Sequence, residues 1–217
     1  MLGRAQTTRE RGRSARALVL VSGLILTGCA SAPTGDVALR PSVQRQATNQ
    51  VVGEAIIASL GGVAVTVHWL AASGVEQFYA ARPGLVYPWP REVWQEAPPT
   101  VFFLRLRNQT SEEVQFDPML ATVVTQDGRR ERPVPYEEMY LRLGETEDSG
   151  PRLRTLQATL FSRFVVIQPG GEREGLLVLP SLEPGTKHLL LELSSFFVGG
   201  RNVPGFFEFQ VLSKKTE

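Results

Sequence analysis

Histidine side chains are the first residues to consider for chemistry, because they titrate near neutral pH and bind metals. The chain has two, His68 and His188, and each falls in a segment where apolar and polar residues alternate as in a β-strand. A metal held between them would need further Cys, Asp or Glu ligands, and neither histidine has one at ligand spacing. We therefore interpret both as solvent-facing strand residues, with metal ligation as the alternative.

Motifs for nucleophilic and phosphate chemistry are missing from the sequence. It contains no Gly-x-Ser-x-Gly nucleophile elbow and no Gly-x-x-x-x-Gly-Lys phosphate loop. A Ser–His–Asp triad stays open, because its members lie far apart in a chain. The acidic residues Glu145, Glu147 and Asp148 lack EF-hand spacing, which favours a solvated loop over a calcium site. The sequence therefore predicts no catalytic residue, no metal site and no cofactor, in a protein that is not an enzyme.

An aromatic and proline-rich segment, residues 78–94, is the most suggestive stretch for binding. Its aromatic side chains include Tyr87, Trp89 and Trp94. Tyr and Trp dominate binding hot spots, so an exposed platform of these rings would suit a glycan, a peptide or a partner protein. We favour the alternative, in which the segment is a long loop whose rings lie over the open end of the core.

The single cysteine, Cys29, ends an N-terminal segment built from three zones. Residues 1–16 are basic and polar, residues 17–26 are apolar, and Leu26-Thr27-Gly28-Cys29 closes the segment. A basic zone, a short apolar zone and small residues at the cut indicate a secretory signal peptide over residues 1–28. The apolar zone is about half of the roughly 20 residues that span a bilayer, which argues against a permanent transmembrane helix.

The residues Leu26-Thr27-Gly28-Cys29 resemble the lipobox of bacterial lipoproteins, and all four positions agree with its pattern. The resemblance implies cleavage between Gly28 and Cys29, a diacylglycerol on the Cys29 thiol, and often an acyl chain on the new amino group. Each buried methylene contributes about 0.8 kcal/mol, so two or three acyl chains anchor a protein almost permanently. Ala30 stands where an Asp would favour inner-membrane retention. We expect a lipid-anchored, periplasm-facing protein of the bacterial cell envelope, with the outer membrane favoured over the inner.

Composition and charge fit an ordinary globular domain behind this signal. Hydrophobic residues make up 42% of the chain and charged residues 21%. Loss of residues 1–28 removes five arginines and one glutamate, which changes the formal net charge from +1 to −3. A mildly acidic protein gives no reason to expect nucleic acid as a partner.

The mature chain divides into two parts that differ in composition and in residue pattern. Residues 29–50 are small, polar and proline-containing, which predicts a lipidated, flexible tether of about 70 Å when fully extended. In residues 51–217, apolar and polar residues alternate with the period of strands, between turns such as Gln126-Asp127-Gly128 and Glu183-Pro184-Gly185. This pattern predicts a β-sandwich domain. Strands are expected at residues 54–60, 63–69, 101–106, 120–125, 164–168, 175–179, 188–193 and 206–211. Short helices over one edge of the sandwich are expected at residues 74–82, 136–143 and 151–161.

From Thr100 onward the chain resembles the small immunoglobulin-like domains of unknown function found in many bacterial lipoproteins. The likeness rests on the strand and polar turn of residues 101–110, the hairpin of residues 116–128, and the turn and returning strand of residues 168–180. The sequence departs from them in the helical insertion at residues 135–161. The resemblance implies an antiparallel, immunoglobulin-like β-sandwich at the envelope and implies no activity.

These observations predict a lipid-anchored, non-catalytic accessory or binding protein that engages another envelope protein or a cell-wall component. The alternative is a carbohydrate- or peptidoglycan-binding module that uses Tyr87, Trp89 and Trp94. A hydrolase with a dispersed active site is the third and least favoured hypothesis.

Overall fold

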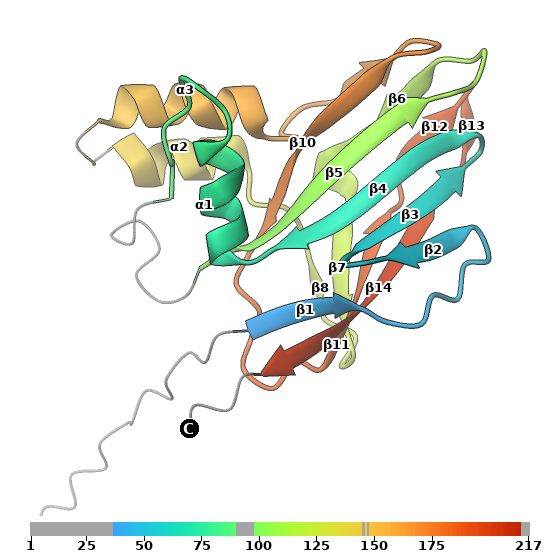
Figure 1. Ribbon diagram of the computed structural model, residues 1–217, viewed down its shortest axis with the longest axis horizontal. Helices are drawn as coiled ribbons and strands as arrows, with labels where there is room; N and C mark the ends of the chain where they lie inside the picture. Colours follow the sequence, from blue (N-terminus) through green and yellow to red (C-terminus); the bar gives the residue numbers. More distant parts are fainter. Residues whose placement is uncertain (1–36, 90–97, 145, 147, 214–217) are drawn as a thin grey trace, which may run out of the picture. The chain divides into compact units, whose positions relative to one another are not determined.

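The computed structural model describes residues 37–89, 98–144, 146 and 148–213, all within one compact unit. They form the mainly β, antiparallel, immunoglobulin-like sandwich that the sequence predicts, with short helices inserted (Figure 1). The first sheet has the order β1 (Val37–Pro41), β14 (Gly205–Ser213), β11 (His188–Leu193), β7 (Thr122–Thr125), β8 (Arg130–Glu131). The second has the order β10 (Glu172–Leu179), β5 (Thr100–Asn108), β4 (Val63–Leu70), β3 (Ala55–Leu60), β2 (Asn49–Val52). The third has the order β13 (Arg201–Asn202), β12 (Phe196–Val198), β6 (Val114–Phe116), β9 (Val165–Ile167).

The main core lies between these sheets and follows from strict alternation along the strands. On β5, Phe102, Leu104 and Leu106 are fully buried while Arg105 between them is exposed, as the sequence predicts. The ring of Phe102 lies 5.1 Å from that of Phe209 on β14, centre to centre, so the first and second sheets meet face to face. Burying side chains of this size contributes about 1.5–3 kcal/mol each.

Helices cover part of the outer face of the second sheet, on the side of its edge strand β10. They are α1 (Ala72–Ala80), α2 (Tyr136–Gly144) and α3 (Ser149–Thr159), and a 3-10 turn, η1, spans Pro118–Leu120 (Figure 1). Where β5 begins and β10 ends, the outward side chains are apolar, including Val101 and Val178, and need a cover. The buried side chains Val75, Met139 and Leu156, one from each helix, pack with them as a second core.

A buried chain of hydrogen bonds crosses the second core. The hydroxyl of Tyr79 lies 3.1 Å from that of Thr159, which donates to the backbone oxygen of Thr155 at 2.8 Å. The Thr155 hydroxyl in turn accepts from the Val86 backbone N–H at 3.0 Å. Burial raises the pKa of Tyr79 to about 12. The network therefore ties α1, α3 and the chain after α1 together through neutral groups.

The prediction of a tether as far as Gln50 is wrong for residues 37–50. Strand β1 pairs antiparallel with β14 from Val37 opposite Ser213 to Pro41 opposite Phe209, and β2 pairs with β3. Leu39 inserts into the main core and is 4% exposed. The apolar alternation of a five-residue edge strand is too short to separate from a polar linker, so the sequence pattern missed it.

Side-chain amides extend the pairing of β14 where β1 ends. Gln44 accepts from the Glu208 backbone N–H at 3.2 Å and donates to the Glu208 oxygen at 2.8 Å. Gln46 accepts from the Phe206 N–H at 3.0 Å, and Asn49 donates to the Phe206 oxygen at 2.7 Å. These amides occupy hydrogen-bonding groups that would otherwise form an open strand edge. The polar composition that indicated a tether is therefore used for edge pairing.

The remaining strand predictions are confirmed in position, although the structure adds short ones. Strands β6, β8, β12 and β13 have three residues or fewer, too few to give a periodic pattern. Leu120 belongs to η1 and not to the strand that follows it. Within the described ranges, none of the helices has the length and apolarity needed to cross a membrane.

Candidate functional site

The aromatic segment contributes to the second core as far as the structure describes it. Trp89 is 5% exposed, and Tyr87 is partly buried with its ring 6.0 Å from that of Tyr79 in an edge-on arrangement. Trp94 lies outside the described residues, as do Gly28 and Cys29. Trp89 is buried and Tyr87 is partly buried against the second core, so their placement matches the packing interpretation of this segment. They cover the outer face of the second sheet and not the open end of the sandwich.

The two histidines lie on different sheets and share no ligand. His68 points outward from β4, with its Nε2 atom 3.8 Å from a carboxylate oxygen of Glu54. His188 is exposed at the start of β11. In the part of the chain that the structure describes, no three His, Cys, Asp or Glu side chains gather to hold a metal. Of the acidic run, Asp148 precedes α3, and Glu145 and Glu147 lie outside the described residues.

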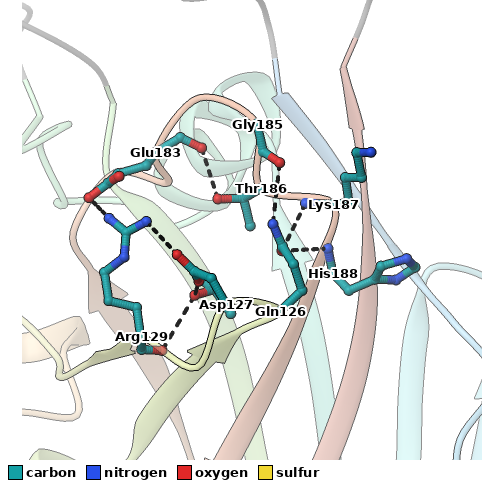
Figure 2. A network of polar contacts seen from close by, with 9 residues as sticks. Gln126, Asp127, Arg129, Glu183, Gly185, Thr186, Lys187 and His188 are labelled. Atoms are coloured by element: carbon teal, nitrogen blue, oxygen red, sulfur yellow. Dashed lines mark hydrogen bonds and ion pairs between the residues drawn. The ribbon is translucent and has the colours of Figure 1, made fainter.

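An exposed polar network joins two turns at one end of the first sheet, and we call it the polar end. One turn connects β7 to β8, and the other is the loop that precedes β11 (Figure 2). Gln126 connects them, because its side-chain oxygen accepts from the backbone N–H groups of Lys187 at 3.0 Å and His188 at 3.2 Å. Its amide nitrogen donates to the Gly185 oxygen at 3.3 Å. One side chain thus fixes two turns that are 61 residues apart in the chain.

Charged groups strengthen the polar end on its other side. The Asp127 carboxylate accepts hydrogen bonds from the Thr125 hydroxyl and, at 2.8 Å, from the Arg129 guanidinium. Arg129 also pairs with Glu183 in the opposite turn (Figure 2). The Thr125 hydroxyl, and next Arg129, lower the pKa of Asp127 to about 2. The Asp127 carboxylate therefore stays ionised beside the Arg129 guanidinium.

A shallow cleft of about 170 Å³ opens beside this network, between the first and second sheets. Its apolar lining comes from β7, β10 and the loop after β10, namely Val123, Leu179, Pro180 and Leu182. Its polar lining includes Arg129 and Glu183 of the polar end, together with hydroxyl groups of Thr125, Ser181 and Thr186. The arrangement offers hydrogen-bond donors, acceptors and charges of both signs on a rigid frame, which suits recognition of polar groups.

We expect Thr125→Val to raise the pKa of Asp127 from about 2 towards its ordinary value of 3.8, because the mutation removes the largest cause of the shift. A carboxylate whose pKa is lowered on folding stabilises the fold above its unfolded pKa and loses that contribution as pH falls through its folded pKa. The variant should therefore have a smaller contribution at neutral pH, and what remains of it is lost at a higher pH. Titration of the carboxyl ¹³C shift measures the change. The same substitution at exposed Thr48 is the control, and an unchanged Asp127 titration in Thr125→Val would contradict the prediction.

Sequence reasoning found both turns of the polar end but assigned them no role beyond reversing the chain. Gln126-Asp127-Gly128 and Glu183-Pro184-Gly185 carry ordinary turn residues, and turn chemistry is a local signal. Which two turns meet is decided by the strand order, since β7 and β11 are neighbours in the first sheet. The only local signal is the glutamine before Asp-Gly, and a glutamine at this position does not specify contact with another turn.

No protein-family model, curated protein or solved structure matches this chain.

Proposed function

We propose that the protein is a lipid-anchored component of the bacterial cell envelope that works by binding another envelope component, without catalysis. The observation that carries the proposal is the position of Cys29. It is the only cysteine of the chain, it completes the lipobox-like Leu26-Thr27-Gly28-Cys29, and it stands eight residues before Val37, where the first strand begins. A lipid-modified terminus next to a folded domain is the arrangement that holds a domain at a membrane surface.

The polar end supports a binding role for the domain. Its turns stand on the strands of a rigid sandwich, and loops held by a rigid scaffold are where binding residues concentrate. Asp127, Arg129 and Glu183 are each between two-fifths and three-fifths exposed, so their outward faces remain open to a partner. Gln126 holds these groups in a fixed geometry, which lowers the entropy lost on binding.

The anchor is tested by replacing Cys29 with alanine in the full chain expressed in a Gram-negative bacterium. Incorporation of an alkyne-palmitate probe should fall at least about twentyfold, because the acceptor thiol is gone and an unprocessed chain offers no new amino group. Intact-mass measurement should show that the variant keeps residues 1–28. Ala30→Ser serves as the matched control and should label like the wild type. Wild-type protein with an unmodified Cys29 would refute the anchor.

The binding role is tested separately by crosslinking in intact cells. A photo-crosslinking amino acid at Lys187, which is exposed at the polar end, should give a discrete adduct with one envelope component. The same amino acid at Ser111, exposed on the turn after β5, is the control position and should not give that adduct. A lipidated protein that yields no reproducible adduct from the polar end would argue against this surface as the binding site.

A further inference from the structure

The spacer between the lipid-bearing residue and the folded domain is much shorter than the sequence pattern indicates. The pattern places a tether as far as Gln50, whereas β1 already begins at Val37. From Cys29 to Val37 there are eight peptide units, which span at most about 28 Å when fully extended. The edge pairing by Gln44, Gln46 and Asn49 binds residues after β1 to β14, so they cannot lengthen the spacer without breaking hydrogen bonds.

The polar end lies at the same end of the first sheet as the point where this spacer enters. Val37 pairs with Ser213, and three residues further along Arg40 pairs with Gln210. Gln210 pairs with His188, and the adjacent Leu189 pairs with Thr125 of β7. The turn after Thr125 and the loop before His188 therefore project in the direction in which β1 begins. The register thus places the polar end and the attachment of the spacer together.

Charges of both signs are exposed at the polar end. Asp127 and Glu183 present carboxylates, Arg129 lies between them, and Lys187 is exposed beside them. Zwitterionic phospholipid headgroups carry a phosphate and an ammonium group side by side. A rigid surface of mixed charges complements such headgroups, because cations meet phosphates and carboxylates meet ammonium groups.

We propose that the polar end of the sandwich rests on the phospholipid headgroup layer, with the short spacer from Cys29 holding it there. The inference rests on the lipid anchor proposed above, and it names the phospholipid headgroups as the envelope component that the polar end contacts. The end of the sandwich that carries Ser111 then faces away from the bilayer. Ser111 follows β5, whose nine residues span about 30 Å from the end at Thr100.

The orientation is tested with the full-length lipidated protein in vesicles of phosphatidylethanolamine and phosphatidylglycerol. Lys187→Cys and Ser111→Cys each provide a single site for a fluorescent label, since the thiol of lipidated Cys29 is blocked. A headgroup spin-labelled lipid should quench the label at residue 187 at least about threefold more than the label at residue 111. Equal quenching, or stronger quenching at residue 111, would overturn the proposal. Circular dichroism of both variants checks that the fold is kept.

A longer spacer tests whether the shortness of the spacer holds the domain at the headgroup layer. Insertion of fourteen Gly and Ser residues after Pro33 raises the extended span to about 77 Å, and the quenching ratio should fall below about two. An unchanged ratio would show that spacer length does not hold the domain and would overturn that part of the proposal. Mass measurement of Cys29 in the same samples separates the two proposals. An unmodified Cys29 refutes the anchor and the orientation together, whereas lipidated protein with equal quenching refutes the orientation alone.

Discussion

Replacing Asn108 by alanine is expected to lower the free energy of unfolding by about 3 kcal/mol, out of a total of about 5–15 kcal/mol for a domain of this kind. Asn108 ends β5 and is fully buried. Its amide nitrogen donates to the backbone oxygens of Glu112 at 2.7 Å and Ile167 at 3.0 Å. Its side-chain oxygen accepts from the backbone N–H of Thr110 at 3.0 Å and from the Thr110 hydroxyl at 2.8 Å.

The size of the effect follows from the buried polar groups that lose their hydrogen-bond partner when alanine replaces Asn108. In the variant, the Ile167 oxygen and the Thr110 N–H lose their hydrogen bonds to the side chain of residue 108. An unsatisfied buried polar group costs about 1–3 kcal/mol. Because Asn108 joins the second sheet to β9 of the third, the turn after β5 should also loosen.

Urea unfolding followed by tryptophan fluorescence measures this change. Asn202→Ala makes the same chemical change at an exposed strand position and should alter stability by less than about 0.5 kcal/mol. An Asn108→Ala variant as stable as Asn202→Ala would contradict the assignment of Asn108 as a buried junction.

The sequence carries the information for Asn108 only in part. An asparagine followed by polar residues predicts a strand end and a turn, which the structure confirms. The pattern contains nothing about Ile167, which reaches Asn108 from a strand 59 residues further along the chain. Long-range partners of a polar side chain are set by the strand order, and one sequence does not encode that order in any local period.

The difference between local patterns and long-range partners also explains which other elements the sequence predicts. Strands such as β4 and β5 are predictable because one face is continuously buried and the alternation runs for eight or nine residues. Strand β1 is missed because it is short and its continuation uses side-chain amides of residues such as Gln44. The polar end was visible only as two turns. The candidate site is therefore less predictable than the fold, since it is made where segments meet and not within any of them.

Replacing Gly175 by alanine is expected to lower the free energy of unfolding by about 2 kcal/mol. Gly175 lies on β10 opposite Leu104 of β5. An added Cβ would lie 2.9 Å from the backbone oxygen of Thr159 and 3.0 Å from the ring of Phe161. That stretch of chain is fixed, because the Phe161 N–H donates to the Leu176 oxygen at 2.9 Å. A backbone atom held in this way cannot move aside cheaply, so the strand or the end of α3 must shift.

The sign of this effect makes the prediction specific. Where alanine can adopt the native backbone conformation without a clash, it stabilises a protein relative to glycine by about 0.4–1 kcal/mol, because it reduces the freedom of the unfolded chain. Gly74 in α1 is the matched control, since its added Cβ would meet only Leu70 at 3.8 Å, an ordinary contact. Gly74→Ala should therefore raise stability while Gly175→Ala lowers it, both measured by urea unfolding. If the two changes had the same sign, the close approach of Thr159 to β10 would not be what requires glycine at position 175.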